Sequence, residues 1–243
     1  MKNPNFSTAQ TPGLWAIIPA AGQGARFGAA QPKQYLQLQT GHTILWHTVH
    51  QLLTHDAIGH VMLALNSEDT YWEQSDVARE LNWSVHTTLG GRHRSESVWN
   101  GLKAIASQVD ANDWVLVHDA CRPCISHADL TCLIQSVEGH AVGGLLALPS
   151  TDTLKRVDAA GDVVSTVDRS VIWRAQTPQI FRYGLLCDAL AHALRLQQMV
   201  TDESNAVELL GKRPSIIPGS GDNIKITHPQ DLQQVELILA KRG

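Results

Sequence analysis

One stretch near the start of the chain has the residue types of an anion-binding loop. A short apolar run over residues 14–18 is followed by small residues and then by two cations, at Ala20, Ala21, Gly22, Gly24, Arg26 and Lys33. Small residues let backbone N–H groups approach an anion closely. Two cations beside such a loop suit a group of high negative charge whose charge rises during a reaction. The stretch therefore favours a triphosphate-binding loop.

Two other interpretations of this stretch remain open, a dinucleotide-binding loop and a simple turn. Gly22, Gly24 and Gly28 form a loose dinucleotide-binding fingerprint, which should be accompanied by an acidic residue at the end of the second strand. The second apolar run instead ends at Asn66. A P-loop does not fit, because Lys33 follows a proline rather than a glycine. A glycine-rich turn with solvated charges is the simplest alternative.

Composition narrows the class of protein. The chain has 243 residues, enough to bury a substantial core, and its net charge of -4 gives no general attraction to nucleic acid or to an anionic membrane. No apolar run approaches the ~20 residues of a membrane-spanning helix. Residues 1–12 are polar and are expected to form a loose tail. We expect a cytoplasmic protein.

The order of apolar segments predicts an α/β fold. Strand and helix patterns alternate up to residue 148, as in a doubly wound, Rossmann-like and mostly parallel sheet with helices on both faces. Expected strands lie at 14–18, 60–65, 83–88, 113–118 and 142–148, and expected helices at 43–55, 72–81 and 92–107. After a change of pattern, residues 176–179 are expected to form a turn, helices are expected at 183–198, 201–210 and 229–241, and a strand at 213–217. We expect one domain over residues 1–243.

Residues at about 150–172 are expected to form a protruding β-hairpin arm around Ala160-Gly161-Asp162. A lone hairpin is marginally stable, so we expect it to pack on another subunit and to make a homodimer. The arm also carries more polar groups than a dimer contact needs, namely Asp152, Thr153, Lys155, Asp168 and Arg169.

Asp119 follows the most apolar of the predicted strands. A carboxylate at the carboxyl end of a buried parallel strand lies where open α/β sheets bind ligands, and Mg²⁺ prefers carboxylate oxygen. Asp119 is therefore a candidate magnesium ligand. A helix-capping role is less suitable, because Ser126 already has the position of the next helix cap. Ser97 and Ser95, after the Gly90-Gly91 pair, could cap a helix or offer hydroxyls to a ligand.

Four cysteines include the pair Cys121 and Cys124, which has the spacing of a redox motif. The pair could also be half of a zinc site, but no second pair completes one. The preceding His118-Asp119 and the following helix start favour a different role.

Eight motifs together resemble the 2-C-methyl-D-erythritol 4-phosphate cytidylyltransferases, over nearly the whole chain. The motifs are residues 19–33 with Gln34-Tyr35, Gly90-Gly91 with Arg94 and Ser97, His118-Asp119-Ala120-x-Arg122-Pro123, Asp152-Thr153-x-Lys155, Thr166-x-Asp168-Arg169, Gln176-Thr177-Pro178-Gln179, Thr201-Asp202-Glu203 and Asp222-Asn223-Ile224-Lys225.

The resemblance implies a nucleotidyltransferase that makes a CDP-linked methylerythritol and pyrophosphate from CTP and a polyol phosphate, with Mg²⁺ as cofactor. By analogy, residues 20–24 cradle CTP, Arg26 and Lys33 stabilise the transition state, and Asp119 binds magnesium. Lys225 and Arg169 hold the acceptor phosphate, the latter from the partner's arm. The remaining implied binding residues are Gly91, Arg94, Ser97, Ala120, Arg122, Thr153, Thr177 and Thr201. No nucleic acid or membrane partner is implied.

Position 121 departs from the family pattern, which usually has Ala or Gly there. Cysteine is nearly as small, so binding should survive, with a possible gain in sensitivity to thiol reagents. Three rival functions remain: a ribitol-5-phosphate cytidylyltransferase, which would share the CTP half of the site; an NAD(P)-dependent oxidoreductase; and a non-catalytic nucleotide-binding protein. Having both Arg26 and Lys33 argues against the last.

Overall fold

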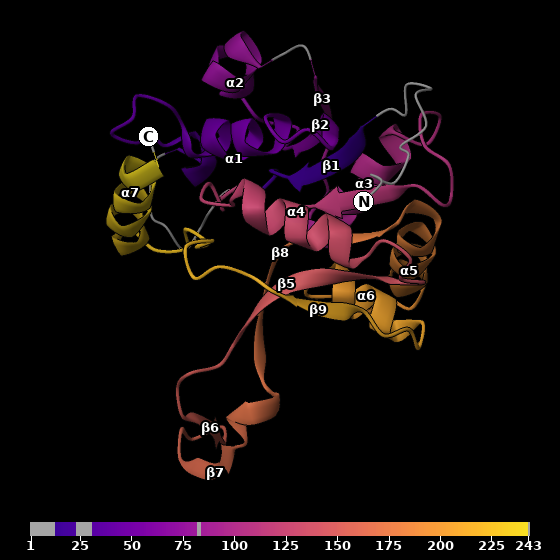
Figure 1. Cartoon of the computed structure of the whole chain (residues 1–243), viewed down its shortest axis with the longest axis vertical. Helices are drawn as coiled ribbons and strands as arrows, with labels where there is room; N and C mark the ends of the chain where they lie inside the picture. The colour runs from indigo at the N-terminus through magenta and orange to yellow at the C-terminus, as the bar shows by residue number, and fades with distance from the viewer. Residues whose placement is uncertain (1–12, 23–30, 82–83, 243) are drawn as a thin grey trace, which may run out of the picture.

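The computed structural model describes residues 13–22, 31–81 and 84–242 (Figure 1). The expected tail at 1–12 and the loop residues Gly24, Arg26 and Gly28 lie outside these ranges. Within them, no helix has both the length and the apolar character needed to cross a membrane.

A seven-stranded, mostly parallel sheet forms the body of the molecule, in the order β3-β2-β1-β4-β8-β5-β9. Its strands are β1 (Leu14–Pro19), β2 (Ile58–Leu65), β3 (Val85–Leu89), β4 (Trp114–Val117), β5 (Gly143–Pro149), β8 (Trp173–Arg182) and β9 (Ser215–Pro218). The helices are α1 (Ile44–Leu53), α2 (Asp76–Glu80), α3 (Arg94–Ala104), α4 (His127–Ser136), α5 (Tyr183–Arg195), α6 (Glu203–Leu209) and α7 (Gln230–Arg242). The Rossmann-like α/β fold expected from the sequence is confirmed.

Alternating side chains of β1 show how the sheet separates two cores. Ala16 and Ile18 are fully buried in one apolar cluster, together with residues of α1, α4 and α7. Trp15 and Ile17 point the other way and pack with residues of α3, α5 and α6. Successive side chains of a strand point to opposite faces, so one continuous apolar run supports helices on both sides.

Side-chain N-caps mark the first turns of several of these helices. The Thr43 side chain accepts a hydrogen bond from the Trp46 N–H at the start of α1, and Ser126 and Asp202 cap α4 and α6 in the same way. Ser126 thus takes the capping role expected of it, which leaves Asp119 free for another. The expected helix at 72–81 is instead a 3₁₀ turn at Trp72–Gln74 followed by the short α2.

β8 corrects the expectation of a turn at residues 176–179. It is a central strand that runs antiparallel between β4 and β5. The pairings Leu145 with Gln179 and Ala147 with Ala175 leave Gln176, Thr177 and Pro178 opposite Leu146 alone. Because proline cannot donate to a ladder, it is accommodated at this bulge rather than in regular pairing. Gln176, Thr177 and Pro178, which suggested a turn, therefore form the bulge, whereas Gln179 pairs regularly with its neighbours.

A hairpin of β6 (Leu154–Val157) and β7 (Val163–Val167) protrudes from the body as an arm (Figure 1). The strands are antiparallel, and Gly161 at the tip has φ +93°. The expected hairpin is confirmed. Its exposed large apolar side chains are Val157, Val163 and Val164.

Gly143 lies where β5 approaches β8 closely, and replacing it with alanine should destabilise the protein. Its φ of +124° favours glycine, and an added Cβ would lie 2.2 Å from the Ile180 carbonyl oxygen. Gly143→Ala should therefore cost roughly 2 kcal/mol or more of unfolding free energy. In thermal denaturation the midpoint should fall by roughly 4 °C or more.

Gly139→Ala is the matched control for that measurement. Gly139 also has a positive φ, +82°, but nothing lies within 4 Å of its added Cβ. Gly139→Ala should lower the free energy of unfolding by only ~1–2 kcal/mol, the cost of placing alanine in a left-handed backbone conformation. Equal losses in the two variants would show that the contact with β8 contributes nothing.

Candidate active site

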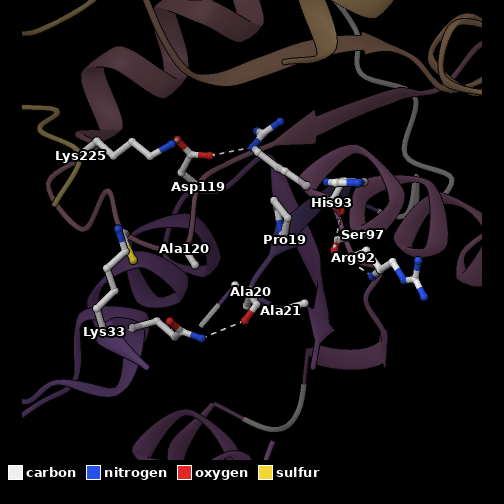
Figure 2. Close-up of a pocket in the computed structure, with 15 residues that line it drawn as sticks. Pro19, Ala20, Ala21, Lys33, Arg92, His93, Ser97, Asp119, Ala120 and Lys225 are labelled. Atoms are coloured by element: carbon white, nitrogen blue, oxygen red, sulfur yellow. Dashed lines mark hydrogen bonds and ion pairs between the residues drawn. The ribbon is translucent and has the colours of Figure 1, made fainter. Parts of the chain in front are cut away.

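The carboxyl ends of β1, β3 and β4 meet at one edge of the sheet and line a cavity of about 240 Å³ (Figure 2). The chain order reverses between β1 and β4, and such switch points are where open α/β sheets bind ligands. The predicted site residues that line the cavity are Ala20, Ala21, Gly22, Lys33, Gly91, Arg94, Ser97, Asp119, Ala120 and Lys225. Ten positions spread over about 200 residues are thus brought together.

Asp119 is the charged centre of this cavity. Its side chain is only 9% exposed, and three cations contact it: Arg94 Nε lies 3.0 Å from Oδ1, while Lys225 Nζ and Arg122 Nε lie 2.9 and 3.3 Å from Oδ2. Burial alone would raise the pKa of this carboxyl, but the charges of Arg94, Lys225 and Arg122 outweigh burial and hold the pKa well below its usual range. Asp119 is therefore ionised at every physiological pH.

Lys33 approaches the cavity from a 3₁₀ turn at Lys33–Tyr35. Its Nζ donates to the Ile226 carbonyl at 2.6 Å, which places it next to Lys225 in the chain's C-terminal part. Figure 2 shows Lys33 and Lys225 on one side of the cavity and Ser97 and His93 on the other. The side with Lys33 and Lys225 is cationic and suited to phosphate, whereas the opposite side combines Ser97 and His93 with a further cation, Arg92.

Ser97 is buried, and its hydroxyl accepts from the Gly91 N–H at 3.0 Å and donates to the His93 carbonyl. Neither Ser97 nor Ser95 caps a helix, since the N-cap of α3 is His93. Glycine is required at position 91, because an added Cβ would lie 2.3 Å from Glu96 Cβ. The Gly91–Ser97 contact therefore shapes the side of the cavity opposite Lys33 and Lys225.

Gln34 braces the loop after β1, although sequence reasoning did not select it. Its buried side chain donates from Nε2 to the Ala20 carbonyl at 2.9 Å. Asn66, at the end of β2, donates likewise to the Ala21 carbonyl at 3.2 Å. Asn66 therefore supports the loop, and this position offers no carboxylate to a dinucleotide ribose. Gln34 could have been selected from the sequence because it belongs to the Pro32-Lys33-Gln34-Tyr35 motif.

Arg122, Thr177 and Thr201 line a neighbouring cavity of about 140 Å³. Arg94, Asp119 and Lys225 line both cavities, so the two adjoin at the same charged cluster. A site with two compartments that meet at a group of cations can bring two anions together.

His118 and Thr177 form a buried hydrogen-bond chain behind Asp119. His118 Nε2 contacts the Arg122 carbonyl, which can only accept, so Nε2 carries the proton and Nδ1 accepts from the Thr177 hydroxyl at 3.0 Å. The same hydroxyl accepts from the Asp119 N–H. Burial lowers the pKa of His118 to about 4, so it is neutral at pH 7. The β8 bulge thus helps to orient Asp119.

Thr153 and Arg169 line neither of these two cavities, because they belong to the arm and its base. Arg169 instead donates to the Thr151 carbonyl of its own chain. Their expected role in the site stays a prediction. The predicted residues Gly24 and Arg26 lie outside the described part of the chain.

Cys121 lines the main cavity, and both it and Cys124 are buried free thiols. Burial raises the pKa of Cys121 to about 11 and that of Cys124 to about 12. A redox-active cysteine reacts as the thiolate, and such raised pKa values favour the protonated thiol, so the two cysteines do not resemble a redox centre.

Comparisons with known proteins identify the family of the chain. The family model "IspD: 2-C-methyl-D-erythritol 4-phosphate cytidylyltransferase" matches residues 14–241. The enzyme of that name from Pseudomonas entomophila (strain L48) is 47% identical over 227 residues, which cover 93% of this chain and 95% of the relative. Among solved structures, a 4-diphosphocytidyl-2C-methyl-D-erythritol synthase has a TM-score of 0.80 and 38% identity, covering 94% of this chain and 98% of that one.

The Francisella tularensis 2-C-methyl-D-erythritol 4-phosphate cytidylyltransferase has a TM-score of 0.78 at 35% identity, covering 93% of this chain and 99% of that one. The matches in sequence and in fold each extend over more than nine-tenths of the chain. The chain belongs to the 2-C-methyl-D-erythritol 4-phosphate cytidylyltransferase family.

Proposed function

We propose that the protein transfers the cytidylyl group of CTP to the phosphate of 2-C-methyl-D-erythritol 4-phosphate. The observation that carries the proposal is the pair of adjoining cavities that share Arg94, Asp119 and Lys225. CTP would occupy the larger cavity, with its phosphates toward Lys33, and the acceptor phosphate the smaller one, beside Arg122, Thr177 and Thr201. The proposed substrates are charged phosphates that a membrane retains, so we also propose a cytoplasmic location.

In the proposed reaction an oxygen of the acceptor phosphate attacks the α-phosphorus of CTP. A new P–O–P bond forms, the bond between the α-phosphorus and the bridging oxygen breaks, and pyrophosphate leaves with the electron pair. The nucleophile is already ionised, so no protein base or nucleophile is required. The protein's task is to position two anions and to stabilise the charge that develops, which suits Lys33 and Lys225.

Both Asp119 oxygens already contact cations, so a magnesium ion at this site would be held mainly by phosphate oxygens, with Asp119 as a nearby carboxylate. Asp119 is the one carboxylate among the described residues that line the larger cavity, and the described residues contain no group of three or more His, Cys, Asp or Glu arranged to hold a metal. Magnesium commonly uses one or two carboxylates together with substrate phosphates. When bound, the ion would neutralise part of the triphosphate charge.

We also propose that the arm packs on a second copy of the chain and delivers Thr153 and Arg169 to the partner's acceptor pocket. Support comes from the exposed Val157, Val163 and Val164, which no other part of the described chain covers. The two arm residues line neither cavity of their own chain, which is expected of groups that act across an interface.

Pyrophosphate release is the direct test of the function. With CTP and Mg²⁺, release should be strong with 2-C-methyl-D-erythritol 4-phosphate and absent with ribitol 5-phosphate, and EDTA should stop it. Release with ribitol 5-phosphate instead would keep the chemistry but change the acceptor. No release with either acceptor would refute the proposed function.

Lys33→Ala tests the cationic side of the cavity. Loss of one donor that stabilises developing charge should lower kcat roughly 100- to 1,000-fold. The fall should lie in kcat rather than in the KM for CTP, because the interaction is strongest in the transition state. Lys212→Ala, at an exposed lysine remote from both cavities, is the control and should match the wild type. A Lys33→Ala enzyme of normal kcat would exclude this role.

Mixing two inactive variants tests whether sites are shared between subunits. Lys33→Ala and Arg169→Ala should each be nearly inactive alone. In a shared-site dimer, a mixed pair has one intact site, so an equimolar mixture that exchanges freely should recover about a quarter of wild-type activity. Recovery requires subunit exchange, which labelled chains can monitor. Exchange without recovered activity would mean that each chain uses its own Arg169.

A further inference from the structure

Glu203 is a buried carboxylate that the proposed mechanism does not use. Its side chain is 1% exposed, and both oxygens accept from one guanidinium: Arg94 Nη1 lies 2.6 Å from Oε1 and Nη2 lies 3.0 Å from Oε2. Arg94 donates its Nε–H to Asp119. One arginine thus joins the first residue of α6 to the charged centre of both cavities.

Both sequence neighbours of Glu203 are anchored to β8, Asp202 by its side chain and Ser204 by its backbone. Gln179 accepts from the Ser204 N–H at 2.8 Å and donates to Asp202 Oδ2 at 2.9 Å. Asp202 also caps α6 by accepting from the Asn205 N–H. A side chain between two such anchors has little freedom, so the Glu203 carboxylate is a fixed point against which Arg94 can be aligned.

Charges favour Arg94 as a bridge rather than as a phosphate ligand. Burial would lower the pKa of Arg94, but the charges of Glu203 and Asp119 raise it above its usual value. Nε, Nη1 and Nη2 each already donate to a carboxylate. A lysine could not replace this arrangement, because only the planar fork of a guanidinium spans two carboxylates with fixed geometry.

Asp119 depends on this alignment because three cations share its two oxygens. Arg94 takes Oδ1, while Arg122 and Lys225 take Oδ2. If Arg94 lost Glu203, its two freed N–H groups would turn to Asp119 and compete there with Arg122 and Lys225. Arg122 lines the smaller cavity and not the larger one, so the disturbance would be felt first at the acceptor side.

We propose that Glu203 is a positioning residue of the transfer reaction, which holds Arg94 so that Asp119 keeps Oδ2 for Lys225 and Arg122. The inference rests on the proposed function, since it assigns the smaller cavity to the acceptor. It adds that α6, remote from the nucleotide loop in sequence, controls how the acceptor phosphate is held.

Glu203→Gln tests the proposal with little change of shape. One amide oxygen can still accept from Arg94, but the amide NH₂ would face an N–H donor, so the bidentate contact is lost. We expect kcat to fall, by up to about 100-fold, as for a reacting group misplaced by ~1 Å. The KM for 2-C-methyl-D-erythritol 4-phosphate should rise while the KM for CTP stays within about threefold.

Glu208→Gln is the matched control. Glu208 lies on the same helix but is exposed, and among the described residues its side chain accepts only from the Ser204 hydroxyl. It should leave both KM values and kcat unchanged. Glu203→Asp keeps the charge on a shorter side chain and should recover part of the activity that Glu203→Gln loses, which a purely steric role would not produce.

A second readout needs no substrate and applies even if Glu203→Gln is inactive. The Nε–H signal of Arg94 in the NMR spectrum, assigned by its absence in Arg94→Lys, should exchange slowly with solvent in the wild type and at least about tenfold faster in Glu203→Gln. If Glu203→Gln fails to fold, Arg94→Lys takes its place in the kinetic test and should show the same rise in acceptor KM.

Two results would overturn the inference: an Arg94 Nε–H that stays protected in Glu203→Gln, or kinetics in which both KM values change equally. Failure of the proposed function is separate, because it would appear as a wild-type enzyme that releases no pyrophosphate. The NMR measurement would then still decide whether Glu203 aligns Arg94.

Discussion

The buried charge of Asp119 is the constraint on which the site depends. A carboxylate in so little water is costly unless cations surround it, and removing one partner of a buried pair destabilises more than the pair itself stabilises. The three cations come from the start of α3, the loop after β4 and the segment before α7. Satisfying one charge therefore ties two distant parts of the chain, the start of α3 and the segment before α7, to the loop after β4.

An irregular segment near the C-terminus receives much of this cross-linking. The Asn223 carbonyl accepts from Arg122 Nη1 at 2.7 Å, and the Ile226 carbonyl accepts from Lys33. The Ile226 N–H donates to the Cys121 carbonyl, and the Asn223 side chain donates to the Thr177 carbonyl. Buried backbone groups outside helices and strands need such partners, and here the partners include the cations of the site. The segment can thus be both irregular and well anchored.

The site is built at the junction of two kinds of sheet geometry. Parallel strands β1, β3 and β4 end in loops that line the main cavity, as expected for a doubly wound sheet. β8 adds an antiparallel neighbour whose bulge extends beyond the end of β4, and Thr177 in that bulge contacts the Asp119 N–H. The second cavity therefore exists because an antiparallel strand enters a parallel sheet beside the switch point.

The sequence by itself determined the alternation of strands and helices, the cap at Ser126, the hairpin arm and the choice of Lys33 and Asp119. These features depend on periodicity, on hydrogen bonds across a few residues, or on motifs, all of which are local. Only the tertiary structure decided that residues 176–178 form a bulge in β8, since the same polar residues and proline also suit a turn. Only the tertiary structure also showed that Arg94 connects Glu203 to Asp119. Arg94 and Glu203 are more than 100 residues apart in the sequence, and a contact over that separation depends on the order of the strands in the sheet, which no local sequence pattern specifies.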